Sequence, residues 1–340
     1  MTGIKKTSLS ISAYNRYTTC PEYYRLNEIN KDGNESTTSA LIFGIAVDEG
    51  CNSILLKKDD TCEQIKKVFK EFKATSKQIF FYSDDFDSDL ISKSELQDLT
   101  KKAIERGFKG KDIVKAIEEI LQNQYEASQN QKEILKDACL LSLEKKAIIC
   151  VNSYSEVIWK KIKRVISVQD DFEIEIAGVK VKGKKDFKAE LLDGTIAILD
   201  NKTTGLPYKA DAIKRSHQLH LYALSENVDT AGFVTISKRL TKNRKKICSK
   251  CKHDGSGLKF ETCNNLINKK RCFGEWIETI QPYSYIQLMV DKVSKKDKDL
   301  TIEAMAGVIK CIDNKVTFKN LNACYNIFGH KCPFFNTCRR

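Results

Sequence analysis

The sequence predicts an α/β fold, a mixed sheet flanked by helices, and three observations support this prediction. Residues 61–166 carry apolar side chains at every third or fourth position, which is the period of amphipathic helices. From residue 171 apolar and polar residues alternate, with Asp193-Gly194 as a turn signal, as expected for about three strands. Helical patterns return at 211–225 and 283–310.

Local signals place the shorter elements. Residues 8–27 predict a helix that opens at a serine cap and is interrupted at Cys20-Pro21, and a second helix should begin near Leu41. An acidic loop occupies residues 83–89 within the helical region. Further along, the run GFVTIS predicts a strand, and the basic run LTKNRKK leads from it to a group of cysteines.

Length and composition fit a folded protein without a membrane anchor. The chain has 340 residues, of which 41% are hydrophobic and 30% charged, as in globular proteins. No apolar stretch is long enough to span a membrane, and the first residues lack the apolar run of a signal peptide. We therefore expect a cytoplasmic protein.

The net charge favours a polyanionic partner. The formal charge is +13 and the isoelectric point about 9.0. Lysine and arginine side chains that neutralise phosphates gain affinity by releasing condensed counterions, so nucleic acid is the expected partner. The alternative is a lysine-rich surface that is merely solvated.

Two carboxylates and a lysine are expected to meet at the ends of neighbouring strands. Asp186 closes the strand VKVKGKKDF, and Asp200 and Lys202 follow across a hairpin. Carboxylates so placed can hold a divalent cation while the lysine stands beside an attacking water. The cation polarises a phosphate and the lysine stabilises developing negative charge, which is the chemistry of phosphodiester hydrolysis.

These residues resemble the motifs of the PD-(D/E)XK nucleases, in particular the RecB-like branch with the CRISPR-associated RecB-like exonucleases and AddB-type iron-sulfur nuclease domains. Gly183-Lys184-Lys185-Asp186 matches Gly-x-x-Asp, and Asp200-Asn201-Lys202 matches Asp/Glu-x-Lys. Gln218 and Tyr222 match Gln-x-x-x-Tyr, whose spacing puts both on one helical face. The resemblance implies a restriction-endonuclease-like mixed sheet and a Mg- or Mn-dependent deoxyribonuclease. An exonuclease acting on single-stranded DNA in recombination and repair is the expectation.

The resemblance also assigns roles. Asp186 and Asp200 would bind the metal with help from the carbonyl of Asn201. Lys202 would handle the water, and Gln218 and Tyr222 would position the lysine and DNA.

One motif departs from the pattern of the branch. Where those nucleases carry Gly-x-x-x-His, this chain has Gly44-Ile45-Ala46-Val47-Asp48. Aspartate suits magnesium or manganese, so Asp48 can replace the imidazole as a ligand. Glu49 is the alternative for this role, and a surface position for Asp48 is the other interpretation.

Thirteen cysteines without a secretion signal favour metal binding over disulfides. The resembling branch holds an iron-sulfur cluster with one cysteine in an N-terminal Cys-Pro motif and three near the C-terminus. The corresponding residues are Cys20, Cys324, Cys332 and Cys338. A 4Fe-4S cluster would fasten the two ends of the chain together as a structural staple. Zinc on the same thiolates is the rival, and His330 could join such a site.

A second group of cysteines predicts an inserted zinc ribbon. Cys248, Cys251, Cys263 and Cys272 have the spacing C-x2-C-x11-C-x8-C, which suits a closed tetrahedral zinc site. His253 is a possible substitute ligand. The surrounding sequence is basic, so the ribbon either grips a nucleic acid backbone or only stabilises an insertion.

Two functions other than a nuclease remain open. One is a DNA-binding protein of this fold that has lost activity. The other is a metal-stabilised scaffold in a recombination or CRISPR-like complex, with the helical insertion as a docking surface for protein partners.

We expect the chain to be organised in five parts. The parts are N-terminal helices with Cys20 (1–60), a helical insertion (61–166), the core (167–246), the ribbon (247–276) and a C-terminal helix with the cysteine cluster (277–340).

Overall fold

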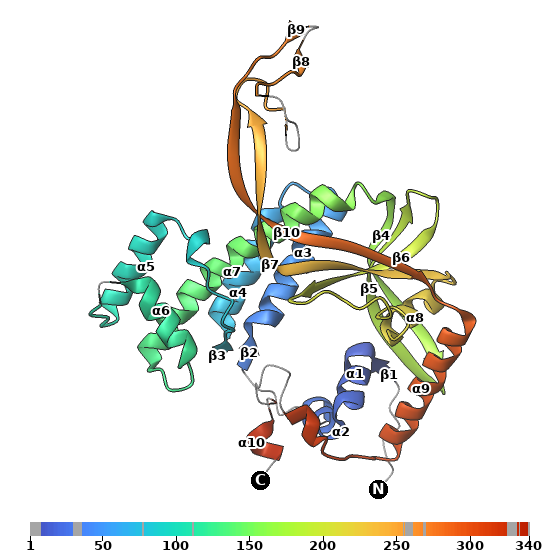
Figure 1. The fold of residues 1–340 in the computed structure, drawn as a ribbon. Coiled ribbons are helices and arrows are strands. Elements are labelled where there is room, and N and C mark those ends of the chain that lie inside the picture. The colour runs from blue at the N-terminus through green and yellow to red at the C-terminus, as the bar shows by residue number, and fades with distance from the viewer. Residues whose placement is uncertain are drawn as a thin grey trace.

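A twisted six-stranded sheet forms the centre of the protein (Figure 1). The strand order is β1-β5-β6-β7-β10, with β4 on the other edge of β5. β1 runs parallel to β5 and β6 parallel to β7, whereas the other neighbours are antiparallel, so the sheet is mixed as predicted. The strands are β1 (Ser8–Ser10), β4 (Ile162–Ile176), β5 (Val179–Leu191), β6 (Ile196–Thr204), β7 (Thr230–Cys248) and β10 (Trp276–Lys292).

The computed structural model describes most of the chain. The described residues are 8–29, 36–76, 78–110, 112–253, 255, 261–267, 270–324, 332 and 334–338.

Two tight turns join the first three long strands. Ala177 and Gly178 connect β4 to β5 with positive φ at both positions, which is the geometry of the turn that matches the twist of paired strands. The predicted Asp193-Gly194 turn joins β5 to β6, and Gly194 has φ of +87°. Asp193 accepts a hydrogen bond of 2.9 Å from the Thr195 amide and so closes this turn.

Helices cover both faces of the sheet because its central strands are apolar on both sides. On β6, Leu199 packs with α3 to α7, whereas Ile198 packs with α1, α8 and α9. On β7, Val234 belongs to the same core as Leu199, and Phe233 belongs to the same core as Ile198. Successive side chains of a strand point to opposite faces, so each face builds its own core.

The N-terminal helices begin and end where the sequence indicates. Ser10 caps α1 (Ile11–Thr19) by accepting a hydrogen bond from the Ala13 amide. Cys20 is extended, and Pro21 starts α2 (Pro21–Tyr24), so the predicted interruption is confirmed. A π-helical turn (Arg25–Ile29) follows α2. The second predicted helix is α3 (Ser39–Leu55), which Thr38 caps.

The helical region contains four helices, the longest of which lies along the sheet. α3 and α7 contribute to the same apolar core as β5, β6 and β7, so this region continues the core of the sheet. A short parallel pair, β2 (Ser36–Thr38) and β3 (Gln78–Phe80), and a 3-10 turn (Ser88–Leu90) lie at its side. The helices are α4 (Thr61–Thr75), α5 (Lys93–Glu105), α6 (Ile113–Gln122) and α7 (Gln129–Ile158).

The prediction of one long helix over 283–310 was wrong in its first third. Residues 283–292 belong to β10, and α9 (Lys295–Asp313) begins at a capping box formed by Ser294 and Asp297. Pairing with β7 along the full length of β10 decides this assignment, because Ile286 fills the core of the sheet.

Three other boundaries also differ from the prediction. α8 (His217–Ser225) starts six residues later than expected, since Ser216 caps it and 211–215 form turns. β4 begins at Ile162, inside the region predicted as helical. β7 continues through the basic run 240–246, which was expected to be a connection.

The distal halves of β7 and β10 form a two-stranded arm that projects from the body, with β8 (Leu266–Ile267) and β9 (Lys270–Arg271) near its tip (Figure 1). The predicted acidic loop 83–89 supports the base of this arm. Lys238 lies 3.8 Å from the buried carboxylate of Asp85, and Lys242 lies 3.3 Å from Asp89.

The C-terminal segment packs against the N-terminal helices. Tyr17 donates a hydrogen bond of 2.7 Å to the Val316 carbonyl, and the Glu22 amide donates one of 3.2 Å to the Phe318 carbonyl. A 3-10 turn (Leu321–Cys324) and α10 (Phe335–Cys338) complete this segment. Within the described residues, none of the helices has the length and apolar character needed to cross a membrane.

Candidate active site and metal centres

Asp186 lies where the pairing of β5 with β6 ends. The last paired residues are Phe187 and Leu199, and beyond them the two strands separate. The amide of Asn201 therefore has no strand partner on this side, and it donates a hydrogen bond of 2.8 Å to Asp186 Oδ2. This bond fixes the Asp186 carboxylate beside the start of the Asp200-Asn201-Lys202 segment.

Asp200 and Lys202 leave β6 on the same side because they are two residues apart on a strand. Asp200 is fully buried, and its Oδ2 lies 2.6 Å from Lys202 Nζ. Lys202 keeps 33% of its side chain exposed. Burial lowers and Asp200 raises the pKa of Lys202, and the net shift is upward, which keeps this lysine cationic.

Helix α8 holds Gln218 and Tyr222 against these strands, on one helical face. The amide of Gln218 donates a hydrogen bond of 3.0 Å to Asp200 Oδ1 and lies 2.6 Å from the Tyr222 hydroxyl. Tyr222 in turn donates a hydrogen bond of 2.7 Å to the Lys184 carbonyl on β5. The pair therefore ties the carboxylate of one strand to the backbone of the other.

Asp48 faces the same site from α3. Its Oδ2 accepts hydrogen bonds of 3.2 Å from Asn52 and 3.4 Å from Gln169. Its Oδ1 is buried and has no hydrogen-bond partner within the described part of the chain. Glu49, the alternative, is exposed.

The three carboxylates carry more negative charge than the protein around them balances. Burial, followed by the charges of Asp200 and Asp48, raises the pKa of Asp186 to about 8. Burial also raises the pKa of Asp48 to about 6, although Asn52 opposes the shift, and the pKa of Asp200 is raised by burial as well. A hard divalent cation would relieve this repulsion and bond to the free Asp48 oxygen, so the chemistry of the donors fits one. The carboxylate oxygens of the three aspartates do not all lie within 4.8 Å of one another, so binding would draw them closer together.

The two histidines of α8 have a structural role. His217 Nδ1 and His220 Nδ1 lie 3.0 and 2.9 Å from the Thr301 hydroxyl on α9, and His220 Nε2 lies 3.0 Å from the Ile213 carbonyl. Since this carbonyl can only accept, His220 carries its proton on Nε2 and accepts from Thr301. These bonds fasten α9 to α8.

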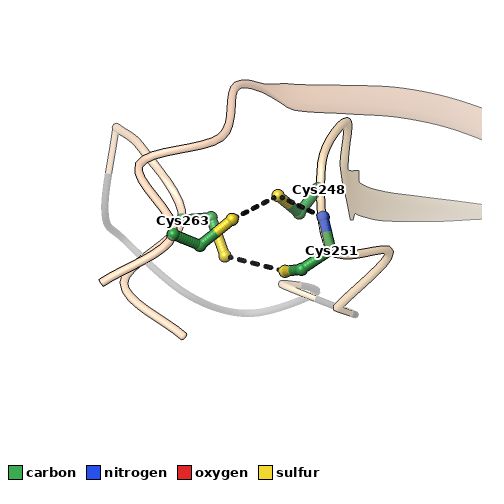
Figure 2. A group of neighbouring side chains, drawn as sticks. Cys248, Cys251 and Cys263 are labelled. Carbon is green, nitrogen blue, oxygen red and sulfur yellow. Dashed lines mark hydrogen bonds between the residues drawn. The ribbon is translucent and has the colours of Figure 1, made fainter. Parts of the chain in front are cut away.

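Cys248, Cys251, Cys263 and Cys272 come together at the tip of the arm, and Figure 2 shows three of them turned toward one another. Their sulfurs all lie within 4.8 Å of one another, with 3.6 Å between Cys248 and Cys272 and between Cys251 and Cys263. Metal–sulfur bonds of about 2.3 Å in a tetrahedron separate sulfurs by about 3.8 Å, so the group fits one metal ion. His253 is not needed to complete it.

The backbone around these cysteines is shaped to the sulfurs. A Cβ on Gly274 would lie 2.4 Å from Cys248 Sγ, so only glycine allows the chain to pass there. The Cys251 amide and the Asn265 side chain point to sulfurs at 3.5 and 3.7 Å. Against the effect of burial, nearby backbone amides lower the pKa of Cys248 to about 6, whereas burial raises the pKa of Cys263 to about 12 and also raises that of Cys272.

Cys20, Cys324, Cys332 and Cys338 also meet, around a cavity of about 20 Å³. The Asn320 amide donates a hydrogen bond of 3.4 Å to Cys20 Sγ, and the Cys332 amide donates one of 2.8 Å to the Cys324 carbonyl. Among the described residues, the arm cysteines are the one group whose ligand atoms all approach within 4.8 Å, so the terminal sulfurs are spread more widely. His330 lies outside the described residues.

The comparison with known families decides the identity of this fold. The model of the PD-(D/E)XK nuclease superfamily matches residues 8–339. The chain belongs to the PD-(D/E)XK nuclease superfamily. The restriction-endonuclease-like mixed sheet expected from the sequence is thereby confirmed.

Other comparisons find more distant likenesses to this PD-(D/E)XK protein. A Eubacterium rectale protein described as a candidate exonuclease is 11% identical, with 98% of this chain and 88% of that chain covered and a TM-score of 0.42. A protein named SSO0001 is 12% identical, with 72% and 97% covered and a TM-score of 0.27. Neither likeness is close enough to bear on function. No curated protein matches the chain.

Three residues near the site were not identified from sequence patterns. Asn52, one helical turn after Asp48, could have been identified by its spacing of four residues. Gln169 reaches Asp48 only because the fold brings β4 to α3. Tyr208 stands close enough to Lys202 for each to shift the pKa of the other, and no local pattern marks it.

Proposed function

We propose that this PD-(D/E)XK protein is a metal-dependent deoxyribonuclease. The observation that carries the proposal is that Asp48 and Asp186 lie near the fully buried Asp200, close enough for their charges to raise the pKa of Asp186, beside the partly exposed Lys202. No structural requirement explains three mutually repelling carboxylates there. Mg²⁺ or Mn²⁺ would be held by these three residues and the Asn201 carbonyl, and when bound would polarise the scissile phosphate and lower the pKa of water.

Lys202 would act on the substrate as a cation. Its raised pKa makes it a poor base, whereas its ammonium can orient a water and stabilise negative charge that develops on the phosphate. Asp200 holds the ammonium at 2.6 Å, which restricts its position before the substrate arrives.

Gln218 and Tyr222 would keep this arrangement in place. The Gln218 amide fixes the orientation of the Asp200 carboxylate, and Tyr222 fixes Gln218. Both would act by positioning, because their hydrogen bonds are made to protein groups. We further propose that the substrate is single-stranded DNA and that cutting starts from an end, because three motifs of the chain resemble those of RecB-like exonucleases.

The two cysteine groups would hold different metals. The close sulfurs of the arm suit zinc. The terminal sulfurs do not all lie within 4.8 Å of one another, a wider spacing that a 4Fe-4S cluster accepts, and they come from both ends of the described chain. We propose that this cluster is structural, since it fastens the C-terminal segment to α1 and α2.

The test is cleavage of end-labelled single- and double-stranded DNA by anaerobically purified protein with Mn²⁺, Mg²⁺ or neither ion. Lys202→Ala should reduce cutting by at least about a hundredfold. Lys115→Ala, an exposed lysine of α6, is the matched control and should cut normally. DNA binding without any cutting by the wild-type protein would instead support the inactive binder, and a stable protein partner with weak DNA affinity would support the scaffold.

A further inference from the structure

Positive charge is concentrated in the arm. Residues 238–280 contain twelve lysines and arginines but four aspartates and glutamates, an excess of eight out of the formal charge of +13 for the whole chain. A bound Zn²⁺ with four thiolates would subtract two charges and leave the excess at six. An eighth of the chain therefore carries about half of the net charge, which a generally lysine-rich surface does not explain.

The arm starts beside the candidate active site and leads away from it. β7 pairs with β6 so that Phe233 lies opposite Asp200, Thr235 opposite Lys202 and Ser237 opposite Thr204. Past Ser237, β10 is the one described strand that accompanies β7, up to the pair of Cys248 and Trp276. These eleven residues extend about 36 Å at about 3.3 Å per residue. This length matches about ten stacked nucleotides of 3.4 Å each.

Basic side chains at the tip of the arm are exposed and free of carboxylate partners. Lys250, Lys252, Lys270 and Arg271 are all exposed, and none of them forms an ion pair with another described residue. By contrast, Lys238 at the base of the arm is anchored to the buried Asp85. The tip thus offers unpaired cations, while the base is fixed to the body of the protein.

An aromatic side chain stands among these cations. Phe273 is 62% exposed and has φ of +48°, which is uncommon for a bulky residue. Phe273 directly follows Cys272, and its amide donates a hydrogen bond of 2.9 Å to the Cys263 carbonyl. The four cysteines of the arm therefore hold its backbone in place. Exposed aromatic rings between basic residues are the surface on which unpaired bases stack.

We propose that the arm is a second DNA-binding site, which holds single-stranded DNA roughly ten nucleotides from the active site. Lys250, Lys252, Lys270 and Arg271 bind phosphates, Phe273 stacks on a base, and the metal-bound cysteines hold these side chains in position. The choice of DNA as the polyanion rests on the proposed function, but binding by the arm does not require that cleavage occurs.

The test compares two quadruple variants by DNA binding, in a Lys202→Ala background without added divalent cation. The arm variant replaces Lys250, Lys252, Lys270 and Arg271 by glutamine. The matched control replaces four exposed lysines of α4 and α5 by glutamine, at Lys67, Lys70, Lys101 and Lys102, so that both lose four positive charges. Fluorescence anisotropy then gives Kd for labelled strands of about 30 and about 6 nucleotides at several salt concentrations.

The arm variant should bind the long strand at least tenfold more weakly. Its slope of log K against log salt should shrink by about 3, because each lost phosphate contact removes about 0.7 on single strands. The short strand and the control variant should show wild-type behaviour. Equal losses in the two variants, or undiminished binding of the long strand by the arm variant, would overturn the proposal.

Phe273→Ala tests the stacking role separately. The variant should bind single strands at least about fivefold more weakly and bind blunt duplex normally, since only unpaired bases can stack on the ring. An equal change on both substrates would remove stacking from the proposal. Zinc content and thermal unfolding of each variant show whether the arm is intact. If the wild type binds through the arm but never cuts, the proposed nuclease function fails while this inference stands.

Discussion

The ammonium of Lys202 lies 2.6 Å from Oδ2 of the fully buried Asp200. A buried carboxylate is costly unless it is paired, so this contact stabilises the site before any metal binds. Gln218 occupies the other oxygen of Asp200. The ion pair and the amide together leave Asp48 as the carboxylate with a free buried oxygen.

The affinity of the site for a divalent cation should therefore depend on Asp48 and not on the adjacent Glu49. Asp48→Ala should weaken Mn²⁺ binding by roughly ten- to a hundredfold, because a ligand to the ion is lost. Asp48→His restores the residue that the RecB-like branch carries and should shift preference from Mg²⁺ toward Mn²⁺, since imidazole is the softer ligand. Isothermal titration calorimetry measures both. Glu49→Ala is the control, and an equal effect there would contradict the assignment of Asp48.

The four cysteines of the arm should lose their ability to bind zinc when Gly274 gains a side chain. In Gly274→Ala the new Cβ would lie 2.4 Å from Cys248 Sγ, so zinc content measured by mass spectrometry should fall to a small fraction. Gly307→Ala in α9 is the control, because nothing lies within 4 Å of its added Cβ. This control should keep its zinc and gain about 0.5–1 kcal/mol of stability. Full zinc occupancy in Gly274→Ala would disprove the close fit.

Iron should depend on the terminal cysteines. Cys20→Ser should abolish the iron and the visible absorption of anaerobically purified protein and lower its Tm, because the C-terminal segment loses its anchor to α2. Cys62→Ser, at an exposed free cysteine, is the matched control and should change neither property. Zinc without iron in the wild-type protein would show that the rival assignment is correct.

Part of the stability that the protein loses on acidification should come from Glu95. Hydrogen bonds from Lys145, at 2.5 Å, and from Ser92 lower its pKa from 4.5 to about 2. A lowered folded-state pKa stabilises above the unfolded pKa, and the gain disappears as the pH falls from about 4.5 to about 2. The Tm difference between wild type and Glu95→Gln should be constant near neutral pH and shrink over that window. Glu118→Gln, at an exposed residue of α6, is the matched control.

Much of the site was predictable because its residues lie in local patterns. Asp186, Asp200 and Lys202 stand at strand ends that alternation and the Asp193-Gly194 turn already indicate. The spacing of Gln218 and Tyr222 required only that their segment be helical.

Long-range contacts account for what the sequence did not reveal. Residues 283–292 have a composition that a helix tolerates, and only their pairing with β7 makes them a strand. The same pairing turned the basic run 240–246 into the stem of the arm. Gln169 meets Asp48 across 121 positions, which no local period can indicate.

The contacts between the two ends of the described chain also set an order of events during synthesis. β1 needs only β5, which has left the ribosome long before residues 316–338 are made. The hydrogen bonds of Tyr17 with Val316 and of Cys20 with Asn320, however, can form only when residues about 300 positions later have been made. A chain that stops early, just after α9, can thus form its sheet, but the side of α1 and α2 that faces the C-terminal segment stays uncovered.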